Sequence, residues 1–549
     1  MEKHTHPPFA IPGAYADMKR ICKEKLKTIY GTNPPALIVE RLDEELSLAD
    51  RENLSSIYML LHHLSVRLQE TGGRIGVRGT LGSTLVSFLL EITDINPLPA
   101  HYRCPSCGYV KFAAKDSGYD LPLKNCPRCD GALSCDGHNI PYETCAELVQ
   151  GKPIQTVDIN VSASAWEKAV SFLVEFLGEE RIACASEWNH PVCFMLLPDG
   201  MKFEDVTPIT ELTPPVCGVR KQTGLPGYEL TPALLRVILL PHNDYDRIRW
   251  LHRLTGTKPE DMDYSDPKIY KLFQNLDTCG IPGFSTDRSK EILQKLKDMQ
   301  FSDLVRVVGM TCGSGVWENN GEQLLQRHSF RDLIATRDDV FLTLRKHGIA
   351  SNTAQTMTES VRKGKFCEDT DQNRKMMQLL LHAGMPARYV ESMRKIHYLF
   401  PKAHAVQCAR KAAVLAWFKI HYPRAFYYVS LASMQAGDLL QYSDEALREK
   451  RKTLNNADTC KGSDLEVIEL LLEARRRKIF LDGQNMYGTV KENERISVHD
   501  HTVYRPAGGR SSRLDLGSRG FHAGHHPDQQ AVAEGKESGR SIPFGFSEE

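Results

Sequence analysis

Two pairs of cysteines constrain the fold of this chain more tightly than any other feature of its sequence. Cys104 and Cys107 lie in "CPSCGY", and Cys126 and Cys129 lie in "NCPRCDG", which gives the spacing C-x2-C-x18-C-x2-C. Two residues between cysteines let one turn direct both sulfurs at one ion, and two such turns complete the tetrahedral four-thiolate shell that Zn²⁺ accepts. Four protein ligands leave no position for water, so we expect a structural zinc ion. Cys135 lies nearby, but the spacing makes it a bystander.

The bulk composition restricts the class of protein. A chain of 549 residues is too long for one core and should divide into three or four units. Its 69 basic and 69 acidic residues cancel, so any basic surface must be local. The longest apolar runs are about half the length that spans a bilayer, and the N-terminal residues lack the apolar core of a signal peptide. The 15 scattered cysteines favour reduced thiols, so we expect a cytoplasmic protein with no membrane partner.

Hydrophobic patterning predicts an α+β part followed by a helical part. Residues 35–69 read as two amphipathic helices with a break at "LADREN". "AWEKAVSFLVEFLG" is typical of a helix, whereas "PVCFMLLPDG" and "LLRVILLPHND" are typical of strands. From about residue 245 to residue 481 the pattern is helical, and beyond about residue 494 it has no sustained period.

The stretch "TVDIN" predicts a strand that carries polar groups. Thr156, Asp158 and Asn160 alternate with apolar residues and therefore point to one face. The other face should enter a core through Val157, Ile159 and Val161. A carboxylate and an amide on one strand face suit a metal ion.

Three short segments are candidates for contact with phosphate. "GVRGTLGS" offers Arg78, Gly79, Gly82 and Ser83, where glycines allow close approach of backbone N–H groups to an anion. "SVRKGK" and "FPKAHA" read as basic loops between helices, with the candidate residues Arg362, Lys363, Lys365, Lys402 and His404. Glycine-rich turns and solvated basic faces are also common without a ligand, so each segment alone leaves both interpretations open.

Taken together, these segments resemble the PolC-type replicative DNA polymerase, the C-family DNA polymerase III alpha subunit of low-GC Gram-positive bacteria. The resemblance runs in family order from about residue 30 to about residue 481. It includes "VRGTLGS", "LEITDINPLPAHYRCPSCGY", "GYDLPLKNCPRCDG", "CGIPGF", "CGSGVW", "ESVRKGK", "KIHYLFPKAHA" and "AWFKIHYP". It implies a palm-like mixed sheet with a zinc-stapled thumb and palm region, then helical fingers. It also implies primer-template DNA as a partner, and replication proteins such as a sliding clamp.

The resemblance implies a division of the chain. We expect an N-terminal extension (1–34), the start of the palm and thumb region (35–100), a four-cysteine zinc-binding segment (101–150), a shortened palm core (151–244), a helical fingers-like region (245–490) and a disordered or aberrant tail (491–549). The family's oligonucleotide-binding fold, PHP domain and exonuclease, which precede the palm, are expected to be missing, as is the duplex-binding region after the fingers. A reading frame shifted near Glu494 is one hypothesis for the tail.

The family's catalytic aspartates are only partly present. Polymerases of this kind use two Mg²⁺ ions held by three aspartates, two in a D-x-D-x-N strand and one on a neighbouring strand before G-H-D-D. Here Thr156 replaces the first aspartate, Asp158 is retained, and Ile238 stands at the third position. On an extended strand Asp244 would lie about 20 Å from position 238, at roughly 3.3 Å per residue, so neither it nor Asp246 should replace that ligand.

A second departure concerns the nucleotide. The family has a basic segment, R-x-T-G-Q-H-P-G-G, between its two aspartate strands, and only His190 and Pro191 of "WNHPVCF" correspond to it. We therefore expect a non-catalytic relative that retains zinc and primer-template binding, and the pattern argues against a Mg²⁺ pair. The alternatives are an active polymerase with an altered metal site and a decaying or non-DNA scaffold protein.

Overall fold

The computed structural model describes residues 9–149, 154–186, 192–226, 234–434, 436–455 and 462–479. The predicted tail from residue 491, including Glu494, lies outside these residues. Within them, no helix combines the length and the apolar character needed to cross a membrane.

Helices alternate with strands in the N-terminal part of the described chain. Their bounds are α1 (Ala14–Tyr30), α2 (Ala36–Arg51), α3 (Ser55–Gln69), α4 (Leu85–Leu89), α5 (Ala146–Val149) and α6 (Trp166–Leu177). The predicted helix pair in residues 35–69 is confirmed, and the break falls at Asn53, whose φ of 54° interrupts the helical path. The predicted helix in "AWEKAVSFLVEFLG" is also confirmed as α6. It buries Ala169, Val170 and Leu173 at helical spacing.

Within the described residues, seven strands form one mixed sheet, called here the central sheet, in the order β1-β5-β10-β7-β6-β9-β8. Their bounds are β1 (Ile75–Val77), β5 (Thr156–Ser162), β6 (Ile182–Ser186), β7 (Cys193–Leu196), β8 (Ile209–Val216), β9 (Val219–Pro226) and β10 (Leu235–His242). The predicted strands in "TVDIN", "PVCFMLLPDG" and "LLRVILLPHND" are therefore confirmed. β5 and β10 run parallel, whereas β1 and β7 pair antiparallel to them.

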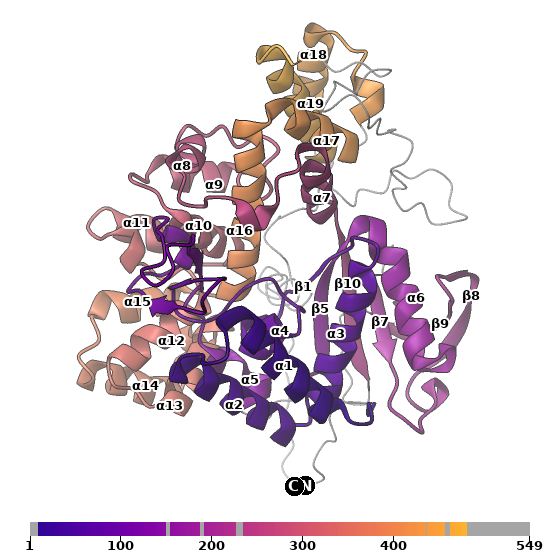
Figure 1. The fold of residues 1–549 in the computed structure, drawn as a ribbon, viewed down its shortest axis with the longest axis vertical. Coiled ribbons are helices and arrows are strands. Elements are labelled where there is room, and N and C mark those ends of the chain that lie inside the picture. Colours follow the sequence, from indigo (N-terminus) through magenta and orange to yellow (C-terminus); the bar gives the residue numbers. More distant parts are fainter. Residues whose placement is uncertain are drawn as a thin grey trace, which may run out of the picture.

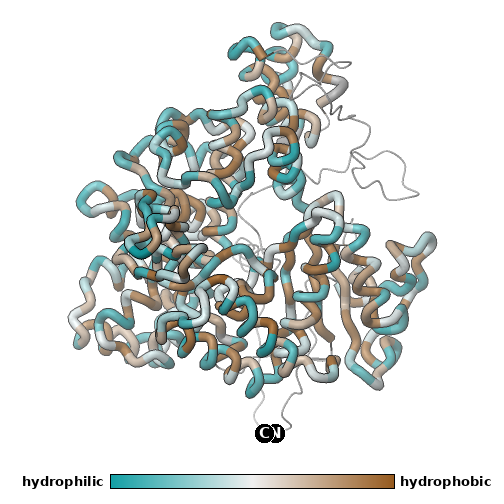
Figure 2. The backbone as a smooth tube through the Cα atoms, in the orientation of Figure 1, coloured by the Kyte–Doolittle hydropathy of each residue, from teal (hydrophilic) through white to brown (hydrophobic). Residues whose placement is uncertain are grey.

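One face of the central sheet is covered by helices α3 and α6, which lie in front of the strands in Figure 1. Val157, Ile159 and Val161 of β5 enter the apolar core beneath these helices, as the alternation predicted. Hydrophobic residues, drawn in brown, recur along the strands of this sheet in Figure 2. The opposite face therefore carries the polar side chains of β5.

A small sheet holds the cysteine-rich segment. It has the order β3-β2-β4 in the part of the chain that is described, with β2 (His101–Arg103), β3 (Val110–Phe112) and β4 (Ser134–Asp136). Its packing is shallow: the buried apolar cluster around it is formed by Tyr102, Leu121, Leu133 and two cysteines. So small a core needs another source of stability, and a bound metal is one.

The remainder of the described chain is helical. The helices are α7 (Asn243–Thr255), α8 (Pro267–Gln274), α9 (Asp287–Gln294), α10 (Phe301–Cys312), α11 (Glu322–Leu325), α12 (Arg337–Lys346), α13 (Ser351–Arg362), α14 (Asp371–His382), α15 (Ala387–Lys395), α16 (Lys402–His421), α17 (Pro423–Ser433), α18 (Asp444–Asn455) and α19 (Gly462–Arg476). The α+β class of the sequence prediction is thus confirmed at the level of a mixed sheet with many helices.

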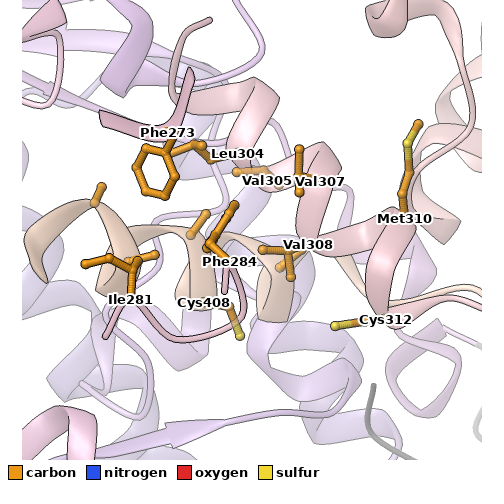
Figure 3. Packing of buried hydrophobic residues seen from close by; sticks show 14 of the residues in the cluster. Phe273, Ile281, Phe284, Leu304, Val305, Val307, Val308, Met310, Cys312 and Cys408 are labelled. Atoms are coloured by element: carbon orange, nitrogen blue, oxygen red, sulfur yellow. The ribbon is translucent and has the colours of Figure 1, made fainter. Parts of the chain in front are cut away.

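Helix α16 is the axis of this helical region. Its sequence is rich in alanine and is buried on nearly all sides, as expected for a helix surrounded by others. Its neighbour α10 packs Leu304 and Val308 toward Phe284 and Phe273, as Figure 3 shows. Arg410 of α16 forms an ion pair with Asp94, which ties the helical region to the α+β part.

Candidate functional site

The four predicted zinc ligands lie together. The Cys104 and Cys129 sulfurs are 3.4 Å apart, those of Cys107 and Cys126 are 3.5 Å apart, and all four lie within 4.8 Å of one another. Each pair sits in a tight turn, in which the Cys104 N–H donates to the Tyr109 carbonyl and the Cys126 N–H to the Gly131 carbonyl, both at 2.8 Å.

The donor set fits a tetrahedral metal. A Zn–S bond of about 2.3 Å requires sulfurs about 3.8 Å apart, which is close to the separations found. Because the turns reverse the chain on both sides, the ion would be enclosed by thiolates and would act structurally. Cys135 lies on β4 and is outside the four-sulfur group, as the spacing predicted.

The parallel pairing of β5 and β10 fixes which residues face one another on the polar face of the central sheet. Asp158 stands opposite Ile238, and Thr156 stands opposite Arg236. Ile238 belongs to an apolar cluster with Cys193 and Met195 of the next strand, β7. The position expected for a third carboxylate is thus occupied by an apolar side chain that packs against its neighbours.

Arg236 places a cation beside the strand that was expected to bind metal. Its side chain is nearly inaccessible, at 1% exposure, and its Nε donates to Thr156 Oγ1 at 3.0 Å. Two dications require several carboxylates in near-octahedral geometry, yet this face offers one aspartate and a buried guanidinium. The residues present therefore do not fit a Mg²⁺ pair.

Asp244 does not fill the gap, although the reason differs in part from the one expected. The strand ends at His242 and helix α7 begins at Asn243, so the assumption of an extended chain to residue 244 was wrong. Burial opposes ionisation of Asp244, but His242 and Lys411 more than offset it, and the pKa lies well below the usual value. Asp246 is bound to the Ser164 backbone N–H at 3.0 Å. Both carboxylates are engaged away from β5.

Asn160 connects the central sheet to helix α16. Its Nδ2 donates to Gln407 Oε1 at 3.3 Å, and both side chains are buried. Gly76, opposite Asn160 on β1, makes this approach possible, because an added Cβ would lie 2.0 Å from Gln407 Nε2. Neither Gly76 nor Gln407 was predicted from the sequence; the available signal was a lone glutamine in the alanine-rich "AVQCARKAAV".

The glycine turn contributes one cation to the region where the central sheet meets α16, called here the junction. Arg78 is half-buried, and its backbone N–H donates to the Asp158 carbonyl at 2.9 Å. Gly79 has open space around it, whereas Gly82 and Ser83 are buried in a 3-10 turn. Ser83 Oγ accepts from Arg337 at 3.4 Å. Of the four candidate residues, only Arg78 and Gly79 reach solvent.

Lys402 and His404 were expected in a basic loop, but that prediction was wrong because α16 begins at Lys402. The Lys402 Nζ donates to the Asn139 carbonyl at 3.3 Å. Burial, Arg78 and Lys411 lower the pKa of His404 far below its usual value, so its imidazole is neutral at pH 7. Both side chains are buried, and they build the interior of the junction.

The "RKGK" segment begins in α13, whose last residue is Arg362, and Lys365 starts a 3-10 turn, so only Lys363 and Gly364 form the expected loop. Arg362 binds both oxygens of Glu359, with Nε–Oε1 at 2.8 Å and Nη2–Oε2 at 3.0 Å. Lys363 is half exposed and lies 3.9 Å from the same carboxylate. Lys365 is exposed and has no ion pair within the described residues. Two of the three basic side chains therefore reach solvent.

The predicted remnant of the nucleotide-contacting segment, His190 and Pro191, lies outside the described residues.

Two family models of known proteins match parts of this chain. Residues 16–190 match the family model of the bacterial DNA polymerase III alpha NTPase domain, and residues 245–383 match that of the bacterial DNA polymerase III alpha subunit finger domain. The chain belongs to the bacterial DNA polymerase III alpha subunit family.

Its relatives within that family include PolC-type DNA polymerases III. It is 30% identical over 543 residues to the DNA polymerase III PolC-type of Clostridium perfringens, covering 86% of this chain and 37% of the relative. It is 29% identical to that of Thermotoga maritima (86% and 39%) and 28% identical to that of Bacillus subtilis (87% and 38%). The chain spans less than two fifths of the length of these relatives.

Proposed function

We propose that this chain is a non-catalytic PolC-type relative, acting in the bacterial cytoplasm, that binds primer-template DNA and a structural zinc ion. In this proposal the central sheet is the palm and the helical region from residue 245 is the fingers. The likeness to the PolC-type family supports this assignment, as does the match of the finger-domain family model. Contact with replication proteins such as a sliding clamp rests on that likeness alone.

The observation that carries the loss of catalysis is the pairing of β5 with β10. Thr156 faces Arg236 and Asp158 faces Ile238, so the face that should bind two dications carries one carboxylate and one buried cation. Loss of two ligands and gain of a positive charge act in the same direction. An enzyme with this face lacks the charge that brings two metal ions together.

The observation that supports retained DNA binding is the exposure of basic side chains at the "RKGK" loop. Lys363 and Lys365 reach solvent, and Arg78 adds a half-buried cation at the glycine turn. Phosphate contacts by such residues dominate the affinity of nucleic-acid binding and make it depend on salt.

Primer extension tests the catalytic half of the proposal. Purified protein with a primer-template, all four deoxynucleotides and Mg²⁺ or Mn²⁺ should add no nucleotide. The double variant Thr156→Asp with Ile238→Asp should also add no nucleotide, because Arg236 remains beside position 156. Incorporation that is lost on Asp158→Ala would instead establish an active enzyme with an altered site.

A salt-dependent binding titration tests the DNA half. Lys363→Ala with Lys365→Ala should weaken binding to primer-template and flatten the slope of log affinity against log salt by about 0.9 for each phosphate that these lysines neutralise. Arg362 is left intact because it neutralises Glu359. The matched control is Lys27→Ala with Lys168→Ala, two exposed lysines on α1 and α6. Absence of binding at low salt would favour a non-DNA scaffold.

A further inference from the structure

A cavity at the far end of the helical region carries an excess of positive charge. It has a volume of about 390 Å³ and lies between the α8–α9 connection and the α18–α19 hairpin. Its charged lining consists of Lys290 from α9, Arg448 and Arg451 from α18, and Glu469, Glu473 and Arg476 from α19. In Figure 1, α18 and α19 lie at the top of the molecule, away from the central sheet.

The residues of α19 in this lining form one helical stripe. Glu469, Glu473 and Arg476 are spaced four and three residues apart, so they share a face of the helix. Arg448 and Arg451 are likewise three apart on α18. The two helices thus present their charged faces to the same cavity.

Glu473 does not neutralise these cations, because it is already paired elsewhere. Its Oε1 lies 2.7 Å from Lys419 Nζ and 3.4 Å from Arg477 Nε, and Tyr427 OH donates to the same oxygen. Lys419 is fully buried, so this pairing is internal to the helical region. Glu469 remains as the one carboxylate of the lining set against the four cations.

The cations themselves have few partners. Within the described residues, Lys290, Arg451 and Arg476 have no carboxylate within 4.0 Å, and Arg448 reaches Asp444 only at 4.0 Å. Both Arg451 and Arg476 are exposed. Like charges gathered around a cavity without counter-ions repel one another, and an anion that enters the cavity relieves that repulsion.

We propose that this cavity binds phosphate groups. Three arginines supply planar donors that match phosphate oxygens, and the lysine adds a point charge. The volume lies within the range of small-ligand sites and accommodates a pair of phosphates. Two sources carry this chemistry, the backbone of a nucleic-acid strand and a free polyphosphate. The site involves neither the central sheet nor the "RKGK" loop, so it goes beyond the function proposed above.

Two binding measurements on the full chain test the proposal. Fluorescence anisotropy with a labelled oligothymidylate of 20 nucleotides measures the affinity for a nucleic-acid strand. Calorimetric titration with inorganic pyrophosphate measures the affinity for a free polyphosphate. The test variant is Arg451→Glu with Arg476→Glu. The control is Lys27→Glu with Lys168→Glu, which makes the same change in net charge at exposed lysines of α1 and α6.

The test variant should lose at least tenfold in affinity for one of the two probes at about 50 mM salt, while the control retains it. For the strand, the salt slope should fall by about 1.4, which corresponds to two single-strand phosphates. A selective loss for the oligonucleotide assigns the site to a backbone, and a selective loss for pyrophosphate assigns it to a free polyphosphate. The proposal is overturned if test variant and control bind both probes alike.

A second variant, Arg451→Gln with Arg476→Gln, removes the two charges without reversing them and so separates a loss of binding from a loss of fold. It should show a smaller loss in the same direction with an unchanged circular dichroism spectrum. The "RKGK" variants serve as an independent comparison, since Lys363→Ala with Lys365→Ala should leave pyrophosphate binding unaltered. A result against primer-template binding can therefore be distinguished from a result against phosphate binding in this cavity.

Discussion

Arg236 should exclude a divalent cation from the central sheet by a margin that the geometry allows us to calculate. A Mg²⁺ ion bound to the side chain of residue 156 lies about 2.1 Å from its oxygen. Arg236 Nε lies 3.0 Å from Thr156 Oγ1, so the ion and the guanidinium nitrogen would be at most about 5.1 Å apart. With an effective dielectric constant of about 20, charges of +2 and +1 at that distance repel by about 6.5 kcal/mol. Every 1.4 kcal/mol is about a factor of ten in affinity, so the repulsion exceeds four orders of magnitude.

Two variants isolate this repulsion. Thr156→Asp with Ile238→Asp introduces the two carboxylates that the resemblance implies but keeps Arg236, which would pair with the new acid. Adding Arg236→Leu removes the cation. In a Mn²⁺ titration followed by electron paramagnetic resonance, the triple variant should bind at least about a hundredfold more tightly than the double variant, after side-chain movement relaxes part of the repulsion.

Circular dichroism establishes that both variants fold, and Asp158→Asn in the triple background should reverse the gain. Equal Mn²⁺ affinity of the folded double and triple variants would refute the assignment of Arg236 as the excluding charge.

Three further predictions concern stability. Cys126→Ser removes one of four thiolates, so it should abolish stoichiometric zinc by atomic absorption and lower the melting temperature, whereas Cys135→Ser should leave zinc content unchanged. Burial opposes the charge of Glu359, but Arg362 lowers its pKa to about 2. The folded pKa lies below the unfolded value of about 4.3, so this stabilisation is present above pH 4.3 and is lost as the pH falls toward 2. Glu359→Gln should remove about 2–3 kcal/mol of that pH dependence in urea unfolding, and an unchanged profile would contradict the pairing. Lys419→Met leaves the buried Glu473 and the partly buried Asp277 short of a partner and should cost about 3–5 kcal/mol of unfolding free energy, while the exposed Lys452→Met should cost almost nothing.

The strands could be predicted from the sequence because the alternation of apolar and polar residues is a local pattern. The period of two in "TVDIN" placed Val157 in the core and Asp158 on the other face, and the structure agrees. The cysteine spacing likewise depends on two short turns, and all four sulfurs meet. Alignment of a single strand was also enough to place Ile238 at the position expected for the third ligand, and the structure pairs this residue with Asp158.

What could not be predicted depends on residues distant in the chain. Alternation assigns Arg236 to a face but does not reveal that β10 pairs in register with β5, 80 residues away. The start of α16 was missed because Pro401 precedes it directly, and a proline followed by basic residues also suits a loop. The basic cavity combines residues from Leu276 to Arg476, and no window of sequence contains them together.

Helix α16 also sets the distance between the central sheet and the basic cavity. Gln407, which contacts the central sheet, and Lys419, which pairs with Glu473 at the basic cavity, are 12 residues apart on one rigid element, or about 18 Å at 1.5 Å per residue. Phosphates along one strand of a duplex recur about every 3.4 Å, so this length corresponds to about five nucleotide steps. Because Gln407 and Lys419 are both buried, a nucleic-acid strand would run outside α16, and only one longer than that could extend from the central sheet to the basic cavity.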